Sequence, residues 1–300
     1  MRIVTRADFD SIVCAVLLYE ALDIKEPVKW VEPNEMQRGL ADIRSGDIIA
    51  NLPYHKNCTM WFDHHYTNRI DTPFEGAFEI APSAAGVIFK YYRDKFTKDY
   101  SELVRETDKI DSADLSADEV NHPENYPYIL LSMTISSHRK DDEPYRSRLI
   151  ALLRKYGIHE VLEDSEIKKR CAEVIKQNKV YKDMILRHTR SEAHVAITDF
   201  RSLEDAPTGN RFLVYSLFPE SAVNVRIRYD IEDKEKVILG VGHSIFNRKC
   251  KVNAGLMLSQ FEGGGHRGAG ACKFHKSKAE EYISKIIAIL LKNESNETNI

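Results

Sequence analysis

The sequence has few cysteines, and their distribution gives no sign of a disulfide framework. The five cysteines are odd in number, are scattered along the chain and form no Cys-x-x-Cys pair. Small secreted domains that depend on disulfides carry dense, paired cysteines instead. The cysteine pattern therefore argues for reduced thiols in a cytoplasm.

Long apolar runs and an excess of positive charge are also missing. No run approaches the roughly 18 apolar residues that span a bilayer, and charges at Arg2, Arg6 and Asp8 interrupt any signal-peptide core. The net charge of −3 provides no basic surface for tight binding to duplex nucleic acid. We therefore expect a cytoplasmic protein without membrane contact, and a small or short anionic ligand remains compatible with this charge.

What the chain does contain is the composition of an ordinary globular protein. Hydrophobic residues make up 43% and charged residues 30% of the sequence. A length of 300 residues is long for one hydrophobic core, so two domains are expected. No internal repeat or low-complexity tract is visible.

Strands alternate with helices in the first part of the sequence. The patterns predict strands at residues 2–6, Val28–Val31, Asp47–Leu52 and Thr59–Phe62, and helices at Ser11–Ala21, Glu35–Arg44 and Ala84–Phe96. This alternation indicates an α/β fold, with a mainly parallel sheet and helices on both faces. In such sheets, ligands collect at the carboxyl ends of the strands.

Polar residues with metal-binding side chains fall at these strand ends. Asp8 and Asp10 follow the first strand, Asn51 lies at the end of the third, and Asp63-His64-His65 follows the apolar run Met60-Trp61-Phe62. Each motif has a plain structural alternative, a helix cap for the acids and an ordinary histidine pair for the second motif. Their joint position at strand ends favours convergence on a divalent metal, because carboxylate and imidazole together suit Mn²⁺, Mg²⁺ or Zn²⁺.

The rest of the chain predicts a helical connector and a second α/β unit. Residues Tyr100–His188 are mostly helical and end in a long, charged helix at Glu166–Arg187. The second unit has predicted strands at His194–Thr198, Val223–Tyr229 and Val237–Val241, and predicted helices at Ala254–Gln260 and Ser277–Leu291.

Three consecutive glycines and a histidine lie between the last two of these helices. Gly263, Gly264, Gly265 and His266 precede a run of small residues. They are a flexible turn or, more plausibly, a loop whose backbone N–H groups close on an anion. Acidic metal ligands in one part of the chain and an anion loop in another indicate phosphoryl-ester chemistry.

These motifs, in this order, resemble the DHH phosphoesterase superfamily over nearly the whole chain. The resemblance is to the two-domain branch with a DHH-associated C-terminal domain, which includes nanoRNA and pAp phosphatases, cyclic-dinucleotide phosphodiesterases, single-strand exonucleases and exopolyphosphatase-like proteins. It implies a metal-binding catalytic domain at residues 1–165, a helical connector at 166–192 and a smaller α/β domain at 193–292 that binds substrate phosphate.

The resemblance also implies roles for individual residues. Asp8, Asp10, His64 and Asn51 match metal-ligand positions. Asp111 matches the ligand of the family's fourth motif, with Asp108 as the alternative. His65 matches a substrate-phosphate contact, so that His65, Asp63 and Arg6 form the implied catalytic group. Gly263, Gly264, Gly265 and His266 match the phosphate-binding loop.

Two positions depart from the family pattern. Arg6 replaces the histidine of the first motif, and Asn51 replaces an aspartate that bridges two metals. An amide carries no charge to offset the repulsion of two cations held about 3.5–4 Å apart. A guanidinium places a permanent cation where the first metal is normally ligated. We therefore expect one firmly bound metal and a second that is weak or absent.

Together these inferences predict a metal-dependent phosphoesterase that hydrolyses a short nucleotide or oligonucleotide. The alternatives are an exopolyphosphatase and a nucleotide- or polyphosphate-binding protein with a degenerate hydrolytic site. The resemblance implies Mn²⁺ as the metal, with Mg²⁺ or Co²⁺ as alternatives. The implied partners are a small phosphorylated substrate or a short single-stranded oligonucleotide, and a second copy of the chain in a homodimer.

Overall fold

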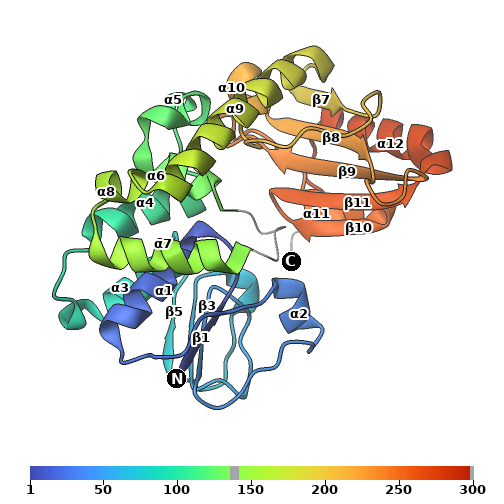
Figure 1. Cartoon of the computed structure of the whole chain (residues 1–300). Helices are drawn as coiled ribbons and strands as arrows, with labels where there is room; N and C mark the ends of the chain where they lie inside the picture. Colours follow the sequence, from blue (N-terminus) through green and yellow to red (C-terminus); the bar gives the residue numbers. More distant parts are fainter. Residues whose placement is uncertain (136–141, 298–300) are drawn as a thin grey trace. The chain divides into compact units, whose positions relative to one another are not determined.

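The computed structural model describes residues 1–135 and 142–297. Contacts divide the chain into two compact units, shown in Figure 1. The first unit contains Met1–Leu115 and Pro123–Glu173, and the second contains Ser116–His122 and Val174–Ile300. The helix α9 (Ser165–His188) contributes to both. The domain limits inferred from the sequence, 1–165, 166–192 and 193–292, stay a prediction.

The first unit is built on a five-stranded sheet in which every neighbouring pair is parallel. Its strands are β1 (Arg2–Thr5), β2 (Lys29–Trp30), β3 (Asp47–Ala50), β4 (Met60–Asp63) and β5 (Gly76–Phe78), in the order β2-β1-β3-β4-β5. All four residues of β3 are buried, as expected for a strand covered on both faces. The predicted parallel α/β sheet is confirmed.

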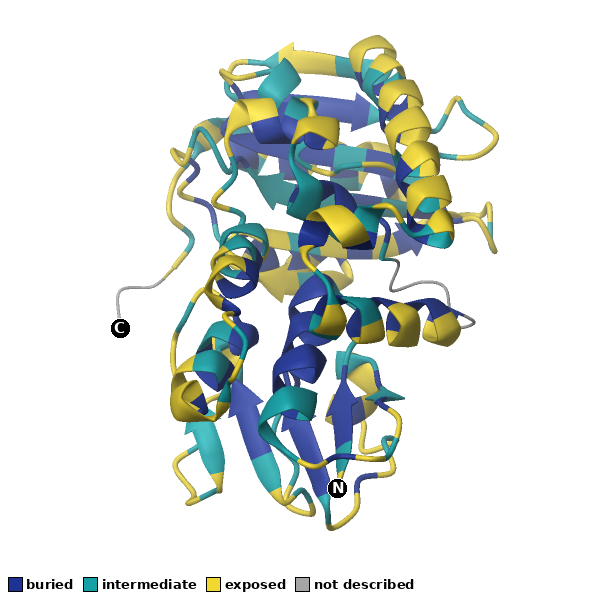
Figure 2. Cartoon of the chain, turned by 60° about the vertical axis from the view of Figure 1, so that its left-hand side comes forward, coloured by how far each residue is buried: buried dark blue, intermediate teal, exposed yellow. Residues whose placement is uncertain are grey.

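Helices cover this sheet, and α1 (Phe9–Ala21) is the most deeply buried of them. Asp8 caps its N-terminus by accepting a hydrogen bond from the backbone of Ser11. The first ten residues of α1 are all buried. Figure 2 shows in dark blue the buried parts of the strands and helices of the chain. The remaining helices of the unit are α2 (Pro33–Gln37), α3 (Ala84–Tyr91), α4 (Ser101–Asp111), α6 (Pro127–Met133), α7 (Glu143–Lys155) and α8 (Ile158–Leu162).

Three details of the first unit differ from the sequence-based expectation. The helix predicted at Ala84–Phe96 ends as an α-helix at Tyr91. The helix predicted at Glu35–Arg44 is wrong from Arg38 onward, because α2 ends at Gln37 and Gly39 takes a left-handed φ of 66°. The strand β5 is absent from the sequence-based prediction. It has only three residues, all partly exposed, so it lacks the apolar alternation that identifies a strand.

The second unit contains a mixed six-stranded sheet. Its strands are β6 (Thr189–Glu192), β7 (Val195–Asp199), β8 (Val223–Tyr229), β9 (Lys236–His243), β10 (Gly263–His266) and β11 (Ala269–His275), in the order β10-β11-β9-β8-β7-β6. Only β7 and β8 are parallel; the other pairs are antiparallel. Its helices are α5 (Ala117–Asn121), α10 (Leu213–Leu217), α11 (Ala254–Leu258) and α12 (Ala279–Lys292), besides its share of α9.

The glycine segment of the second unit is a strand and not the open loop expected from the sequence. Gly263–His266 forms β10, which pairs with β11 at the edge of the sheet. Gly265 has a φ of 149°, and a Cβ there would lie 2.4 Å from the carbonyl oxygen of Ala269. The absence of a side chain at Gly265 is therefore needed for the pairing itself.

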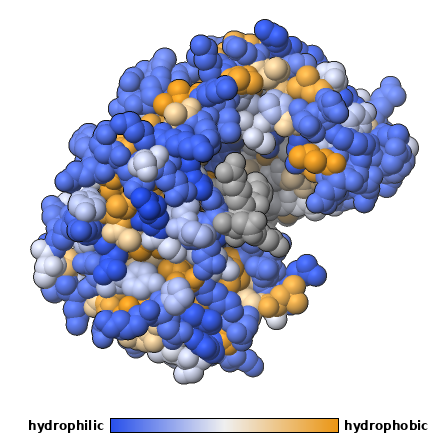
Figure 3. All heavy atoms as spheres, in the orientation of Figure 1, coloured by the Kyte–Doolittle hydropathy of each residue, from blue (hydrophilic) through white to orange (hydrophobic). Residues whose placement is uncertain are grey.

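The helices and the surface were examined for apolar stretches. Within the described ranges, no helix is long and apolar enough to cross a membrane. The face in Figure 3 is mostly hydrophilic, with apolar groups scattered over it. All five cysteines lie in the described ranges and are free thiols.

Candidate active site

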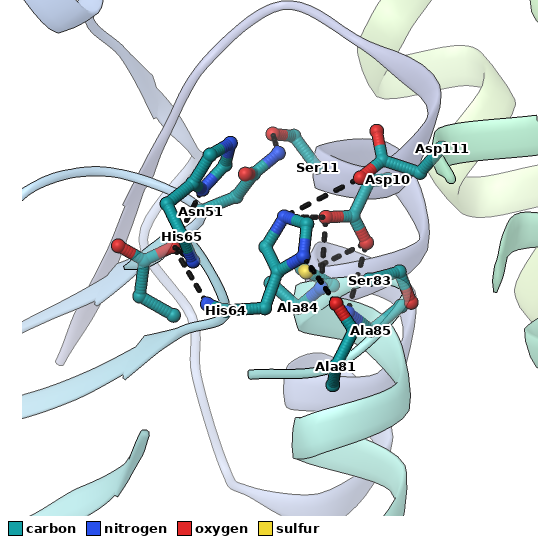
Figure 4. Close-up of polar contacts among 12 residues, drawn as sticks. Asp10, Ser11, Asn51, His64, His65, Ala81, Ser83, Ala84, Ala85 and Asp111 are labelled. Carbon is teal, nitrogen blue, oxygen red and sulfur yellow. Dashed lines mark hydrogen bonds and ion pairs between the residues drawn. The ribbon is translucent and has the colours of Figure 1, made fainter. Parts of the chain in front are cut away.

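The polar residues that follow separate strands of the first unit lie together in the structure. Asp8 follows β1, Asn51 follows β3, and His64 follows β4. Because the three strands are parallel and adjacent, their carboxyl ends meet at one edge of the sheet. Figure 4 shows Asp10, Asn51, His64 and His65 gathered at this edge.

Asp10 is held by the first turn of α3. It is 2% exposed, and its two oxygens accept hydrogen bonds from the backbone N–H groups of Ala84 at 3.0 Å and Ala85 at 2.8 Å. Burial and the nearby charge of Asp8 nevertheless raise the pKa of Asp10 to about 7. A buried carboxylate with this pKa is a group that a bound cation would stabilise.

His64 has one ring nitrogen bound and one free to act as a ligand. Its Nδ1 lies 2.9 Å from the carbonyl oxygen of Ala81. Because a carbonyl can only accept, Nδ1 carries the proton, and the neutral ring has its lone pair on Nε2. This Nε2 is buried and has no hydrogen-bond partner among the described residues. It lies 3.3 Å from Oδ2 of Asp111 and 3.9 Å from Oδ2 of Asp10.

The structure distinguishes the positions of Asp111 and Asp108, which the sequence could not. Asp111, at the end of α4, faces His64, and burial together with the charges of Asp10 and Asp8 raises its pKa to about 7. Asp108 accepts a hydrogen bond from the Ser83 hydroxyl at 2.5 Å, and Ser83 caps α3. Asp108 therefore fixes α3, whereas Asp111 is placed among the possible metal ligands.

Asp63 is fully buried and orients His65. It accepts hydrogen bonds from the backbone of His64 at 2.8 Å, from Nδ2 of Asn68 at 2.6 Å and from Nδ1 of His65 at 2.9 Å. The hydrogen bond to Asp63 raises the pKa of His65, despite its partial burial. This pair favours an imidazolium at His65, which can donate from Nε2 to a phosphoryl oxygen.

Asp8 is already surrounded by donors. It accepts from Nε of Arg6 at 2.9 Å, from the backbone of Ser11 at 2.9 Å, and from Nδ2 of Asn51 at 3.1 and 3.2 Å. Asn51 takes a left-handed φ of 55°, and the same amide also donates to the Ser11 hydroxyl at 3.1 Å. The two residues that depart from the family pattern thus both bind the same carboxylate.

The donor set fits one divalent cation. Ligand atoms of Asp10, His64 and Asp111 lie within 4.8 Å of one another, and two of these residues are carboxylates. The unpartnered, buried Nε2 of His64 completes a set of oxygen and nitrogen ligands that suits Mn²⁺ or Mg²⁺. A second group, Asp63, His64 and His65, meets the same distance limit, but Asp63 is engaged by several N–H donors.

The glycine segment lies in the second unit, away in sequence from these residues. Gly263, Gly264 and His266 are exposed or half-buried on the edge strand β10. A Cβ atom added at Gly264 would have no other atom within 4 Å, so the space that a side chain would occupy there is open. The structure does not test whether the segment binds phosphate, and its predicted role stays a prediction.

Sequence reasoning missed the groups that orient the site. The carbonyl of Ala81, the backbone amides of Ala84 and Ala85, and the side chain of Asn68 bind the possible ligands without belonging to any motif. Backbone groups carry no signal in the sequence, so these contacts could not be predicted. The sequence signal closest to these two amides is the predicted start of a helix at Ala84.

The chain is similar along almost its full length to a pGpG-specific phosphodiesterase, PggH, from Vibrio cholerae. The two chains are 30% identical with a TM-score of 0.85, and the match covers 98% of this chain and 99% of the other. None of the family models compared with the sequence matches it, and no curated protein does either.

Two more distant structures share the fold. An exopolyphosphatase-related protein from Bacteroides fragilis is 12% identical with a TM-score of 0.53, over 97% of this chain and 92% of the other. A RecJ from Thermus thermophilus in complex with Mn²⁺ is 13% identical with a TM-score of 0.56, over 97% of this chain and 52% of the other. At these identities the likeness concerns the fold alone.

Proposed function

We propose that this chain, a metal-dependent phosphoesterase that belongs to the two-domain branch of the DHH superfamily, cleaves the linear dinucleotide pGpG. The observation that carries the proposal is its 30% identity over 98% of its length to a pGpG-specific phosphodiesterase. The cluster of Asp10, His64 and Asp111 supplies the metal-binding residues that such an activity requires.

The reaction is hydrolysis of the single bridging phosphodiester of the dinucleotide. The oxygen of water bonds to phosphorus, the bond from phosphorus to the 3′ oxygen breaks, and that oxygen gains a proton. The products are two molecules of GMP. A divalent cation at the site supplies positive charge that acidifies water and offsets the charge on the phosphodiester.

Residues of the first unit have distinct roles in this proposal. Asp10, His64 and Asp111 hold the cation, and Asn51 contributes its free carbonyl oxygen. His65 is oriented by Asp63, and its Nε2–H donates a hydrogen bond to a phosphoryl oxygen. Arg6, half-exposed and paired with Asp8, places a second positive charge beside the site. The guanidinium thus stands in for the charge of a second metal.

The proposal extends to the assignments that the sequence suggested. Residues 1–165 form the metal-binding catalytic part, 166–192 the connector and 193–292 the part that binds substrate phosphate, through Gly263, Gly264, Gly265 and His266. Mn²⁺ is the proposed physiological metal, a cytoplasmic location is expected, and a homodimer is the proposed assembly. Polyphosphate and other short nucleotides are the competing substrates.

A substrate panel tests the proposal. The purified chain is assayed with pGpG, pApA, pAp, cyclic dinucleotides and polyphosphate, each with Mn²⁺, Mg²⁺ or Co²⁺ and with a chelator. We expect GMP from pGpG with Mn²⁺, slower turnover of the other substrates, and no product with chelator. Binding of pGpG without turnover under every metal condition would instead support a degenerate site that only binds nucleotides.

A further inference from the structure

The two most exposed large hydrophobic side chains of the described chain lie in the segments that form the candidate active site. Tyr66 is 71% and Ile80 is 69% exposed. Tyr66 directly follows His65, and Ile80 directly precedes Ala81, whose carbonyl oxygen lies 2.9 Å from Nδ1 of His64. Figure 4 shows Ala81 next to His64. The backbones that carry the two apolar side chains are therefore those that carry and orient the two histidines.

Strand pairing brings these two segments to the same edge of the sheet. In the parallel pair of β4 and β5, Asp63 lies opposite Phe78. The pairing continues one step further, because the backbone N–H of Glu79 donates to the carbonyl oxygen of Asp63 at 3.3 Å. Tyr66 is three residues beyond Asp63, and Ile80 is two residues beyond Phe78. Both apolar residues thus follow the carboxyl ends of neighbouring strands.

The backbone of Tyr66 is held in a fixed position. It begins a short 3₁₀ turn, Tyr66–Asn68. Asn68 donates from its backbone to the carbonyl oxygen of His65 at 2.9 Å and from Nδ2 to Asp63 at 2.6 Å. Asp63 also binds Nδ1 of His65. One buried carboxylate therefore orients both the histidine and the turn that carries Tyr66.

The exposed side chains contribute little to the stability of the fold. The Tyr66 side chain makes no hydrogen bond and no ring contact with a described residue. Nearby apolar residues such as Ile70 and Phe74 pack against a core cluster of the first unit, and Tyr66 and Ile80 lie outside this cluster. Exposed apolar side chains beside converging polar groups are typical of a ligand-binding surface.

We propose that Tyr66 and Ile80 form an apolar surface that binds one guanine base of the dinucleotide, beside the phosphoryl group that His65 contacts. This inference rests on the proposed function. Every base has a π-face that stacks on an aromatic side chain, and only a ribose separates a base from its phosphate. Polyphosphate has no base and gains nothing from such a surface. The two side chains therefore favour a nucleotide substrate over polyphosphate.

The experiment measures ligand binding to the full chain by calorimetry, with chelator present so that no ligand is hydrolysed. The ligands are pGpG and two abasic analogues, each with a hydrogen atom in place of one guanine. We expect Tyr66→Ala to weaken pGpG binding about 10- to 100-fold, the range of one base stacked on an aromatic ring. The same variant should bind one of the abasic analogues as tightly as the wild type does.

Conservative and distant variants provide the controls. Tyr66→Phe keeps the aromatic face and should bind pGpG nearly as tightly as the wild type. Ile80→Ala should weaken pGpG binding to a smaller extent than Tyr66→Ala, because a base stacks on the ring. Ile231→Ala removes a similarly exposed side chain, 63% exposed, from the second unit, and it should change nothing.

Three results would overturn the proposal. The first is unchanged pGpG affinity in Tyr66→Ala, including the case in which sedimentation shows a changed oligomeric state and the surface therefore contacts a second copy of the chain. The second is equal weakening of pGpG and both abasic analogues in Tyr66→Ala. The third is a loss in Tyr66→Phe as large as that in Tyr66→Ala. If Tyr66→Ala does not fold, Ile80→Ala with the same ligands decides.

Turnover with Mn²⁺ separates this inference from the proposed function. If the wild type does not cleave pGpG but Tyr66→Ala loses base-dependent binding, the function is wrong and the base-binding surface stands. If the wild type cleaves pGpG and Tyr66→Ala has the same KM and the same affinity, the function stands and the base-binding surface is wrong.

Discussion

Asp8 and His64 differ in how many of their hydrogen-bonding positions are already filled. The Asp8 carboxylate accepts from Arg6, Asn51 and the Ser11 backbone, whereas Nε2 of His64 is buried and unpartnered within the described chain. A group whose lone pairs are engaged by donors has little capacity left for a cation. The cation therefore depends more on His64 than on Asp8.

Calorimetric titration of Mn²⁺ into His64→Ala and Asp8→Ala tests this difference. We expect His64→Ala to weaken Mn²⁺ binding by about 100-fold or more, because even the loss of a group that only orients a ligand costs about 10- to 100-fold. Asp8→Ala should weaken it much less. Equal losses in the two variants would show that Asp8 is a ligand of the same importance.

Arg6 and Asn51 act on the same carboxylate, so their substitution is best examined together. Arg6→His alone removes the cation beside the site, and we expect hydrolysis of pGpG to slow by about 10³-fold, by analogy with arginines that stabilise phosphoryl charge elsewhere. Arg93→His, at an exposed arginine of the same unit, should leave the rate unchanged. Steady-state rates across these variants provide the measurement.

The double variant, Arg6→His with Asn51→Asp, tests whether a second metal position has been lost. Without a cation, the carboxylate introduced by Asn51→Asp would face Asp8, and two carboxylates at this distance repel each other. We expect this variant to bind two Mn²⁺ ions where the wild type binds one, as counted by calorimetry. If the double variant hydrolyses pGpG and the wild type does not, Arg6 and Asn51 have only removed metal ligands. They would then not replace the function of the second metal.

At the scale of single elements, β10 combines two kinds of glycine. Gly265 needs its positive φ and its missing Cβ for pairing with β11, whereas Gly264 faces open space. A substitution at Gly265 therefore confounds folding with ligand binding. Gly264 offers the cleaner test of a phosphate contact.

We expect Gly264→Ala to weaken pGpG binding about 10-fold if phosphate approaches this backbone, because the added methyl group occupies the space of the ligand. Thermal stability should change little. Gly240→Ala, with similar free space on β9, is the matched control for strand propensity, and Gly265→Val should lower stability. If Gly264→Ala folds and binds pGpG as tightly as the wild type does, β10 has a structural role and does not contact the phosphate.

At the scale of the whole molecule, metal binding should couple to stability through Asp10 and Asp111. Both have a pKa of about 7 in the metal-free chain, above the ordinary value of 3.8. Between these values the folded state holds protons that the unfolded state has released, so metal-free stability falls as pH rises through this range. Metal binding requires the ionised carboxylates.

We therefore expect Mn²⁺ to stabilise the chain more at about pH 8 than at about pH 6, where it must displace protons. At a concentration 100-fold above its Kd, the cation contributes about 2.7 kcal/mol. Both tryptophans, Trp30 and Trp61, lie in the first unit, so their fluorescence follows the unfolding of that unit. If Mn²⁺ raised the Tm equally at both pH values, Asp10 and Asp111 would not lose protons between them when the metal binds.

The parallel sheet of the first unit and the convergence of its strand-end motifs could be predicted from the sequence alone. Buried strands such as β3 consist mainly of continuous apolar residues, and parallel strands bring their carboxyl ends together whatever the side chains are. These are local or topological rules, so one sequence is enough to apply them. The motifs that identify the family, and the departures from them at Arg6 and Asn51, are short sequence patterns. They could therefore also be recognised from one sequence.

Only the tertiary structure decided which groups face one another. It placed Asp111 beside His64 and tied Asp108 to Ser83, although the two acids are three residues apart on one helix. It bound Asp8 to Arg6 and Asn51, and it turned the glycine segment into an edge strand. These contacts join residues far apart in the sequence, and their geometry depends on packing that no local pattern encodes.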